Sequence, residues 1–591
     1  MEEMRRNVTC GRLTAADEGR SVILNGWVHR TRDHGGVHFL NIRDRYGITQ
    51  VVVDEDADPA LQRAAEEAKL EYCVAVRGTV RRRPEEMVNP DMATGEIELA
   101  ADRLDILSPC ATLPFMIDER SEAREETRLK YRYLDLRSFS MQRKIALRAE
   151  VSFRVREYLR KRGFHEIETP TMIRSTPEGA RDFLIPSRLH RGKFYAMPQS
   201  PQLYKQILMV SGFDRYFQIA HCFRDEDARG DRQLEHTQID IEMSFVSKDD
   251  VFELVEGMMS HVFEGALERT LTTPFPRIAY HDAMNRYGSD KPDLRFELEL
   301  QDGERIARES GFRVFEQTIE SGGSVKVLVV PDGAKLSRKQ IDELEGVART
   351  YRAKGLAWCK IGAEGLEGGI SKFIAGKETE IRALGANEGD LVLFVADKWN
   401  VATTALGAVR SRLGQELGLI DRNRFAFAWI VDFPLFEWDE DNEKWEAAHH
   451  MFTMPQEGYL DSMEEDPGAV KGDLYDLVCN GYELASGSIR IHNPDIQQRI
   501  FDIVGFSREE AEKRFGFLME AFKYGAPPHG GIAPGLDRLL MILAGEDSIR
   551  EVIAFPKTTA GVSPMDDSPS EVDEQQLREL GIRVEQEDSK D

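Results

Sequence analysis

Cysteine is scarce in this sequence, and no two cysteines form a C-x-x-C pair. Six cysteines are scattered through 591 residues, which excludes a disulfide scaffold and a structural zinc site made of thiolates. No run of about 18 apolar residues occurs, so no membrane-spanning helix is predicted. The first residues, Met1–Arg6, are charged where a signal peptide would be apolar. These absences predict a soluble, cytoplasmic protein that makes no contact with a membrane.

The common nucleotide-binding and hydrolytic motifs are also missing. The sequence contains no G-x-x-x-x-G-K-[ST], G-x-G-x-x-G, H-E-x-x-H or G-x-S-x-G pattern. His34 and His38 are four residues apart, but Gly35 and Gly36 between them argue against a helix that would align them as metal ligands. If the chain uses a nucleotide, it must do so without the usual phosphate-binding loops.

Basic residues are in the minority and are concentrated at the front of the chain. Lys and Arg number 78 against 104 Asp and Glu, a net charge of −26, which argues against a protein that coats nucleic acid by bulk charge. Between Arg20 and Arg45, however, there are five arginines and only two acids, whereas the segment from Pro564 onward has ten acids and three bases. A local face for nucleic acid is therefore compatible with the composition.

The length predicts about four domains, and the first 110 residues have the pattern of a small β-barrel. Short β-rich runs at 22–28, 39–43, 50–53, 72–80 and 97–99 surround one helical stretch at 61–70, as in barrels of the OB type. With a period of two, Phe39, Asn41 and Arg43 share one face of their strand. This face suits single-stranded nucleic acid, and a solvated barrel face with one stray aromatic fits equally well.

A charged loop between strands at 216–220 and 237–245 is the strongest local signal of a site. On the second strand, apolar residues that include Phe245 alternate with Gln238, Asp240 and Glu242. The polar face is either an exposed sheet edge or a row of carboxylates that hold an amino group or a metal in a cavity. Arg224 lies in the loop, and the fixed fork of donors on arginine suits phosphate.

Two later segments carry residues of the kinds that bind ligands. A strand at 488–492 contains Arg490, and Asp476 and Glu483 lie just upstream. Two carboxylates near a nucleotide suit a Mg²⁺ bridge, although ordinary surface acids fit the same pattern. Residues 530–538 predict a glycine-rich turn before a helix with Arg538 in its first turn, which is an arrangement for anion binding.

In order and spacing, these segments resemble motifs 1, 2 and 3 of the class II aminoacyl-tRNA synthetases. The motif 1 counterpart is a helix, strand and proline unit that ends at Pro170, and the motif 2 counterpart is the F-R-x-E sequence at 223–226. In detail, the segments that resemble the bacterial-type aspartyl-tRNA synthetases of class IIb are Thr176–Asp182, Gln199–Lys205, Phe223–Asp227 and Gly535–Arg538. The resemblance covers nearly the whole chain, from Gly26 to Lys557.

The resemblance implies an α+β multidomain fold. Its parts are an OB-type anticodon-binding barrel at 1–110, a hinge at 111–140, a class II antiparallel-sheet catalytic domain in two pieces at 141–300 and 416–560, a small inserted α/β domain at 301–415, and a C-terminal extension at 561–591. The insertion is typical of bacterial members. Its sequence has its own strand and helix pattern, with strands at 325–330 and 356–361 around a helix at 339–352.

The resemblance also implies roles for individual residues, with Arg224 and Arg538 as the catalytic pair on the ATP phosphates. The other expected ATP contacts are Asp225, Glu226, Gln233, Glu483, Gly535, Leu536 and Asp537. The expected aspartate contacts are Glu178, Ser200, Gln202, Lys205, Arg224, Asp240, His449 and Arg490. Mg²⁺ is expected on Asp476, Glu483 and Ser486, and the tRNA anticodon on Arg32, His34, Phe39, Gln50 and Glu86.

The implied activity is aspartate–tRNA ligation, with ATP, L-aspartate and tRNA(Asp) as substrates and a second copy of the chain as partner; DNA is not an expected partner. An asparaginyl or lysyl enzyme of the same class, or a non-catalytic RNA-binding relative, are the alternatives. Whether tRNA(Asn) is also charged stays open. In the family, a histidine at the position of His34 accompanies relaxed enzymes, whereas Glu86 replaces a glycine that relaxed enzymes often have.

Overall fold

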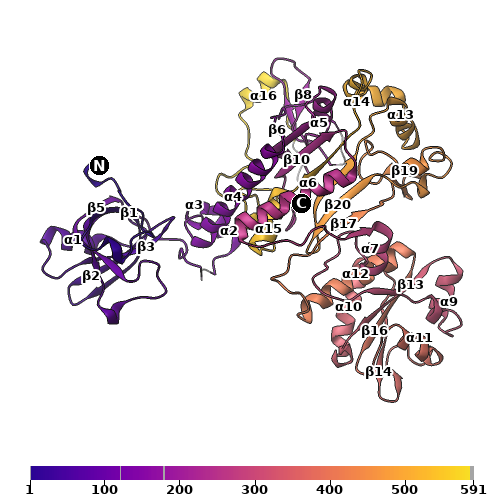
Figure 1. Cartoon of the computed structure of the whole chain (residues 1–591), viewed down its shortest axis with the longest axis horizontal. Helices are drawn as coiled ribbons and strands as arrows, with labels where there is room; N and C mark the ends of the chain where they lie inside the picture. Colours follow the sequence, from indigo (N-terminus) through magenta and orange to yellow (C-terminus); the bar gives the residue numbers. More distant parts are fainter. Residues whose placement is uncertain (1, 120–121, 177–179, 586–591) are drawn as a thin grey trace. The chain divides into compact units, whose positions relative to one another are not determined.

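The computed structural model describes residues 2–119, 122–176 and 180–585. The chain divides into two compact units, one made of 1–146 with 563–568 and the other of 147–562 with 569–591. Among the described residues, no helix is long and apolar enough to cross a membrane. Figure 1 shows the elements of both units in sequence colours.

The first unit contains a closed barrel with the strand order β1-β2-β3-β5-β4. Its strands are β1 (Ser21–His34), β2 (Val37–Asp44), β3 (Gly47–Val53), β4 (Cys73–Arg82) and β5 (Ile97–Ser108), and α1 (Pro59–Glu67) lies between β3 and β4. Asp58 caps α1 by accepting a hydrogen bond from the amide of Ala60. The inward side chains of the strands form a buried aliphatic core. The OB-type barrel predicted from the sequence is confirmed.

Three helices follow the barrel, namely α2 (Glu125–Lys130), α3 (Arg132–Asp135) and the long α4 (Phe139–Lys161), which runs into the second unit. The centre of the second unit is an eight-stranded sheet with the order β11-β17-β20-β21-β22-β10-β9-β6. Its strands are β6 (His165–Glu166), β9 (Arg215–Phe223), β10 (Glu235–Ser244), β11 (Arg277–Ala279), β17 (Phe427–Val431), β20 (Leu474–Cys479), β21 (Tyr482–Ile489) and β22 (His529–Pro534). Neighbouring strands are antiparallel except for the outermost pair at each end.

Strand β10 is an interior strand, with β9 on one side and β22 on the other. Its apolar side chains enter the core, and Asp240 and Glu242 on the opposite face are fully buried. The exposed-edge interpretation of this alternation is therefore wrong. Phe245 does not continue the strand as expected, because the backbone turns at a φ of 58° there and leaves its side chain 73% exposed.

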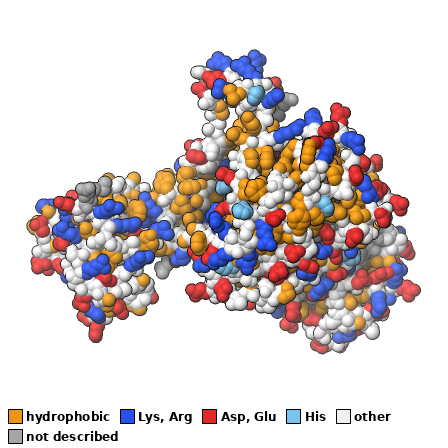
Figure 2. All heavy atoms as spheres, turned by 45° about the horizontal axis from the view of Figure 1, so that its top comes forward, with side chains coloured by type: hydrophobic (Ala, Val, Ile, Leu, Met, Phe, Trp, Pro, Cys, Tyr) orange, Lys and Arg blue, Asp and Glu red, His pale blue; other side chains and the backbone are white. Residues whose placement is uncertain are grey.

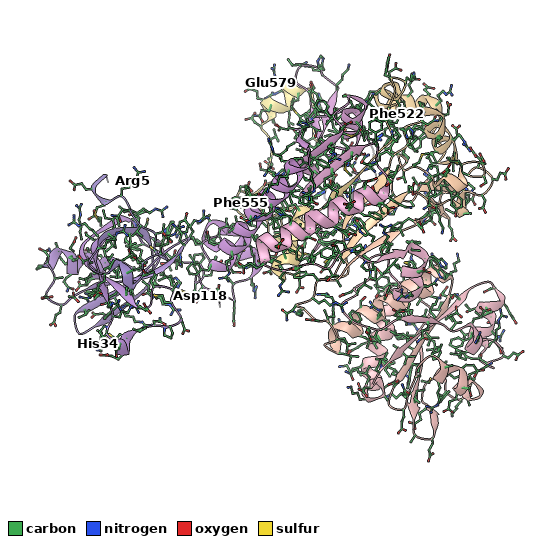
Figure 3. The ribbon with its side chains drawn as sticks, in the orientation of Figure 1. Arg5, His34, Asp118, Phe522, Phe555 and Glu579 are labelled. Atoms are coloured by element: carbon green, nitrogen blue, oxygen red, sulfur yellow. The ribbon has the colours of Figure 1, made fainter. Side chains whose placement is uncertain are left out.

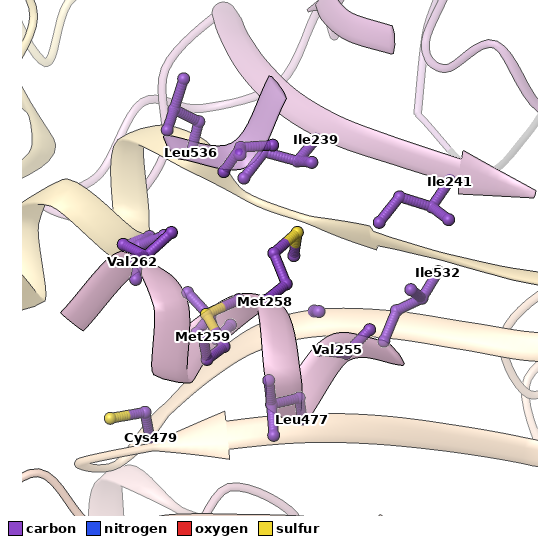
Figure 4. Packing of buried hydrophobic residues seen from close by; sticks show 14 of the residues in the cluster. Ile239, Ile241, Val255, Met258, Met259, Val262, Leu477, Cys479, Ile532 and Leu536 are labelled. Carbon is purple, nitrogen blue, oxygen red and sulfur yellow. The ribbon is translucent and has the colours of Figure 1, made fainter. Parts of the chain in front are cut away.

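Helices cover one face of this sheet. The long helix α4, α6 (Lys248–Leu267) and α15 (Leu536–Ala544) pack their apolar side chains against β10, β17, β20 and β22 in the largest core of the chain. Figure 4 shows Met258 and Met259 of α6 packed between strand residues such as Ile241 and Leu477. Because the apolar face of each strand is used in this way, its polar face is left for the opposite side of the sheet.

The remaining elements surround the sheet. They are β7 (Leu184–Pro186), β8 (Phe194–Ala196), α5 (Gln202–Val210), α7 (Tyr280–Tyr287), β18 (Phe436–Asp439), β19 (Lys444–Ala447), α13 (Pro494–Ile503), α14 (Arg508–Phe522) and α16 (Glu574–Leu580). On the face of the second unit drawn in Figure 2, apolar side chains gather among charged side chains of both signs.

The inserted module is a five-stranded antiparallel sheet with the order β12-β13-β16-β14-β15. Its elements are β12 (Leu300–Asp302), α8 (Glu304–Ala307), α9 (Arg313–Glu320), β13 (Ser324–Val330), α10 (Arg338–Thr350), β14 (Ala357–Gly362), β15 (Gly365–Glu367), α11 (Glu378–Ala383), β16 (Leu391–Asp397) and α12 (Trp399–Glu416). Buried Arg410 of α12 donates to the carbonyls of Asp293 and Phe296, which fixes α12 to the segment that enters the module.

The glycine-rich segment at 530–534 is a strand rather than the expected turn. It forms β22, between β21 and β10. A Cβ on Gly531 would lie 2.0 Å from Oε2 of Glu242 and 2.2 Å from the carbonyl oxygen of Ile241. Glycine is therefore required because the neighbouring strand and the buried Glu242 side chain fill the space that a side chain would need.

We expect Gly531→Ala to lower the free energy of unfolding by about 2–3 kcal/mol, the cost of overpacking a dense interior. Gly516→Ala in α14 is the matched control, because its added methyl group meets only the Glu512 side chain at 3.4 Å. Thermal unfolding of both variants checks this expectation, and equal midpoints would contradict it.

Candidate active site

A cavity of about 930 Å³ opens on the polar face of the eight-stranded sheet. Its wall is formed by residues of α5, β10, β21 and the start of α15, together with the loops that follow β9 and β19. The expected site residues that line it are Ser200, Gln202, Lys205, Arg224, Glu226, Gln233, Asp240, His449, Glu483, Ser486, Arg490, Gly535, Asp537 and Arg538. Residues from distant parts of the sequence thus share one cavity.

Arg224 and Arg538 both line this cavity. Arg224 follows β9, where its amide donates to the carbonyl of Leu234, and Arg538 lies in the first turn of α15. The Nε atoms of both side chains are buried and have no hydrogen-bond partner. Such unsatisfied donors are costly unless a ligand accepts from them.

The imidazole of His236 reports the combined charge of the two arginines. Burial, reinforced by the charges of Arg224 and Arg538, lowers the pKa of His236 to about 3. Both guanidinium groups are therefore close enough to His236 to act on its charge, although they are far apart in the sequence. The expectation that they share a cleft is met, and the cleft suits a polyanion.

The carboxylate of Asp537 accepts hydrogen bonds from two groups of the protein that the sequence did not indicate. Its Oδ2 accepts from the amide of Thr237 at 2.7 Å, and its Oδ1 accepts from Arg148 of α4. The carboxylate therefore fixes the start of α15 to β10 and is already bonded within the protein. The side chain of Leu536, another expected ATP contact, is 1% exposed and lies in the core.

Two carboxylates and two cations form a buried cluster at one end of the cavity. Nζ of Lys205 donates to Oδ1 of Asp240 at 2.7 Å and lies 3.2 Å from Oε2 of Glu242. Nε of Arg490 donates to Oε1 of Glu242 at 3.0 Å. All four side chains are at most 2% exposed. Glu242 thus holds both cations in position.

The two carboxylates of the cluster differ in their ability to accept a further hydrogen bond. Burial raises the pKa of Asp240, and its Oδ2 is buried without a partner. Burial also acts to raise the pKa of Glu242, but the charges of Arg490 and Lys205 outweigh it and leave that pKa lowered. Glu242 is thus an ionised anchor, whereas Asp240 has an oxygen available for a donor such as an ammonium group.

Sequence reasoning placed Glu242 on the polar face beside Asp240 but gave it no individual role, and it missed two other contributors to this region. Nε2 of His450 lies 2.8 Å from Nη1 of Arg490, and only its position next to His449 could have indicated it. Gln206 accepts from Nε2 of Gln202 at 3.1 Å and lies 3.1 Å from Nε2 of His529.

Strand β21 ends at Ile489, earlier than the strand expected at 488–492, and Arg490 follows it as an isolated bridge with Thr453.

The expected metal ligands lie on β20 and β21. Asp476 and Ser486 are directly opposite each other, and Oδ1 of Asp476 is buried without a partner. Glu483 and Ser486 line the cavity, whereas Asp476 is buried and is not among the residues that line it.

These three oxygen-bearing side chains fit Mg²⁺, which prefers oxygen ligands and retains several waters. The orphaned Oδ1 of Asp476 is the observation that favours a cation there. Nε2 of His449, 3.7 Å from Oδ2 of Asp476, is the neighbouring group on the other oxygen. Within the described ranges, no group of three or more His, Cys, Asp or Glu side chains is arranged as a metal site.

Of the other residues expected to contact ATP or aspartate, some line the cavity and others do not. Oε2 of Glu226 lies 3.3 Å from Nη1 of Arg232, and Oε1 of Gln233 accepts from the amide of Lys557 at 3.0 Å. Asp225 does not line the cavity; its amide donates to the carbonyl of Arg181. Glu178 lies outside the described residues.

In the barrel, four of the five expected anticodon residues lie on the sheet formed by β1, β2 and β3. Phe39 is directly opposite Arg32 on β1, and Gln50 on β3 is opposite Asn41. His34 is exposed at the end of β1. Glu86 lies apart from these strands, exposed in a short 3₁₀ turn at 85–87.

Arg43 does not join this face as the period of two predicts. It is 2% exposed, and its Nη1 lies 2.8 Å from Oε1 of Glu71. Near the end of β2, the barrel wall and the segment before β4 enclose the side chain, and a buried guanidinium needs such a carboxylate partner. The outer cations of the face are instead Arg30 and Arg32, both exposed on β1.

Two family models match the chain. The model described as tRNA synthetases class II (D, K and N) matches residues 124–559, and the model described as an OB-fold nucleic acid binding domain matches residues 22–107. The second match covers most of the closed barrel, and the first covers the eight-stranded sheet together with the inserted module.

Several bacterial proteins resemble the chain over its length. It is 63% identical over 588 residues to the Aspartate--tRNA(Asp/Asn) ligase of Treponema denticola, with 99% of this chain and 100% of that protein covered. The proteins of the same name from Borrelia garinii and Geotalea uraniireducens are 50% and 51% identical, each over 98% of this chain and over 99% and 98% of their own lengths.

Solved structures agree on the fold. The asparaginyl-tRNA synthetase of Pyrococcus horikoshii, complexed with asparaginyl-adenylate, superposes with a TM-score of 0.59 at 19% identity, covering 94% of this chain and 98% of that one. The aspartyl tRNA synthetase of Entamoeba histolytica gives 0.58 at 18% identity, with 95% and 92% covered. The predicted fold class is confirmed.

Proposed function

The chain belongs to the class II tRNA synthetases of the D, K and N group, and we propose that it is an aspartate–tRNA ligase. In the first step, the α-carboxylate of L-aspartate attacks the α-phosphate of ATP, which forms aspartyl-adenylate and releases pyrophosphate. In the second step, the 3′-terminal ribose hydroxyl of the tRNA attacks the carbonyl carbon of the adenylate and releases AMP. The observation that carries the proposal is one cavity lined by Arg224, Arg538, Lys205 and Arg490.

The first step needs alignment and charge neutralisation rather than a general base, because the attacking carboxylate is already ionised at neutral pH. The free Nε donors of Arg224 and Arg538 supply hydrogen bonds to phosphate oxygens where negative charge accumulates. The absence of a Ser–His or Cys–His pair from the expected site residues accords with such a reaction.

The cluster around Glu242 supports aspartate as the amino acid. Lys205 and Arg490 offer donors to a side-chain carboxylate, and the free oxygen of Asp240 suits the amino group. Asparagine would place an amide –NH₂ against these donors. A site built around specific polar partners discriminates by roughly 10⁴-fold or more.

Asp476, Glu483 and Ser486 would hold Mg²⁺ when ATP binds. The ion would supply neutralisation of the phosphate charge. The homodimer stays a prediction from the family resemblance, and the cytoplasmic location stays a prediction from the sequence.

Pyrophosphate exchange tests the proposal. Labelled pyrophosphate should enter ATP in the presence of aspartate and fail to do so with asparagine or lysine. The absence of exchange with aspartate would refute the proposal, and exchange with lysine or asparagine alone would assign the chain to a sibling specificity.

Relatives from several bacterial genera have a name that includes both tRNAs, and we propose the same range for this chain, with exposed His34 among the residues that admit both anticodons. We expect His34→Leu to reduce the charging of tRNA(Asn) relative to tRNA(Asp) by about tenfold, or about 1.4 kcal/mol. Steady-state charging of each purified tRNA measures this ratio.

The matched control is His190→Leu, because His190 is an exposed histidine in the second unit. It should leave the ratio unchanged. If His34→Leu lowers the charging of both tRNAs equally, His34 contributes to binding and not to discrimination.

A further inference from the structure

A second cavity, of about 780 Å³, is lined only by residues of the first unit, which contains the barrel. Its size falls in the range of small-molecule sites, roughly 300–1,000 Å³. The residues that line it come from the N-terminal segment, β1, the end of β2 and the residue after it, β4, β5, the segment that joins α3 to α4, and the first turn of α4. None of the residues expected to read the anticodon lines this cavity.

The wall of this cavity is strongly basic. Its arginines are Arg5, Arg6, Arg43, Arg45 and Arg137. A single carboxylate, Glu71, lies 2.8 Å from Nη1 of Arg43 and 3.0 Å from Nη1 of Arg137. One negative charge thus neutralises two guanidinium groups.

The other acids do not restore the balance. Asp44 lies 3.6 Å from Arg6, and Asp105 is engaged by Arg103 at 3.0 Å. Within the described ranges, no carboxylate is in ion-pair distance of Arg5 or Arg45. The cavity therefore keeps an excess of about three positive charges, in a chain whose net charge is −26.

The wall also contains the ring of Trp27 and an unused acceptor on Asn25, and the ring of Tyr46 lies beside the lining residue Arg45. The guanidinium carbon of Arg137 lies 4.8 Å from the ring centroid of Trp27, and that of Arg45 lies 5.0 Å from the centroid of Tyr46. Oδ1 of Asn25 is buried without a partner, while Nδ2 of the same side chain donates to the carbonyl of Met4 at 3.2 Å. Stacking surfaces, anion donors and a hydrogen-bond acceptor are thus combined.

This cavity is separate from the expected anticodon face. Arg5 and His34 lie on opposite sides of the barrel (Figure 3). The strand positions agree, because His34 is at the last residue of β1 whereas Asn25 and Trp27 are in its first half. A ligand here would not compete directly with Phe39 or Arg32.

We propose that this cavity binds a nucleoside 5′-phosphate, either as a free nucleotide or as one residue of an RNA strand. Its phosphate would accept from Arg5 and Arg45, its base would stack in the region of Trp27, and a base N–H would donate to Asn25. Arginines around a phosphate and an aromatic wall for a base are the elements of nucleotide recognition. Only the RNA source rests on the proposed ligase function.

Guanosine 5′-monophosphate is the suitable probe, since adenine nucleotides would also enter the proposed active site and guanine has N–H donors for Asn25. In calorimetric titrations of the full chain, we expect one GMP site and at least about tenfold weaker binding of guanosine. The double variant Arg5→Glu/Arg45→Glu should weaken GMP binding by about tenfold or more. Both side chains are exposed, so the fold should be retained.

Arg305→Glu in α8 is the matched control, because it changes the charge of an exposed arginine in the other unit. The same preparations are assayed for the KM of tRNA in charging and for aspartate-dependent exchange. A response of GMP affinity alone identifies a free nucleotide as the source. A rise in the KM of tRNA, with competition by GMP, identifies an RNA residue.

The proposal is overturned if neither GMP affinity nor the KM of tRNA responds to the double variant. Exchange needs no tRNA and should be unchanged in both variants. If the parent protein itself lacks exchange, the ligase proposal fails. The GMP titration still tests the proposed nucleotide site in that case.

Discussion

Arg538→Ala is expected to reduce aspartate-dependent pyrophosphate exchange by about 10³-fold or more, the typical effect of removing an arginine from a phosphoryl-transfer site. Nε of Arg538 is buried at the cavity with no partner in the protein, and Nη2 reaches Oδ2 of Asp231 at 3.2 Å. The side chain is therefore held in position with a donor unused. Its loss should remove stabilisation of the transition state more than it removes stability of the fold.

Arg508→Ala supplies the matched control, because Arg508 is exposed at the start of α14 and does not line the cavity. Exchange should stay at the parental level in this variant, and thermal unfolding should be similar for all three proteins. Full exchange in folded Arg538→Ala would contradict the assignment of this arginine to the ATP phosphates.

Arg490→Lys is expected to lower kcat/KM for aspartate by about 10²-fold while the KM of ATP is retained. The guanidinium of Arg490 donates to Glu242 at 3.0 Å and to Oγ of Ser488 at 2.6 Å, and it contacts Nε2 of His450 at 2.8 Å. An ammonium group keeps the charge opposite Glu242 but cannot reproduce this fork. The substitution therefore tests geometry without leaving a buried carboxylate unpaired.

Arg499→Lys is the control for this variant, because Arg499 of α13 also pairs with a glutamate, Glu464, but this pair is more exposed than the buried pair of Arg490 and Glu242. It should leave both kinetic constants unchanged. If the KM values of ATP and aspartate instead rise together in Arg490→Lys, the arginine supports the whole cavity and does not select the amino acid.

Local patterns predicted those features of the fold that depend on neighbouring residues. The period of two identified β10 and the opposite faces of Ile241 and Asp240, and the position of Arg538 in the first turn of α15 was correct. The same reasoning failed for β22, because a glycine-rich segment indicates a turn unless the space around it is known. Only the approach of Glu242 and β10 explains why Gly531 belongs to a strand.

For the candidate site, the sequence offered residue types, and the family resemblance assigned them to ATP, aspartate, Mg²⁺ and tRNA. The partners of those residues were not predictable. Asp537 seemed suited to ATP by its position, yet Thr237 and Arg148 occupy its carboxylate. Arg43 seemed part of a nucleic-acid face, yet Glu71 buries it in an ion pair. Each outcome depends on a contact with a residue far away in the chain.

The sequence by itself determined most of the strands, the start of α15 and the alternation of polar and apolar faces on β10, because these follow from the backbone geometry of adjacent residues. The tertiary structure decided which polar face became a cavity, which carboxylates received cations, and that Arg224 and Arg538 line the same cavity. The physical reason is that strand order and register join residues across long loops, where burial and charge pairing, and not local propensity, select the partner.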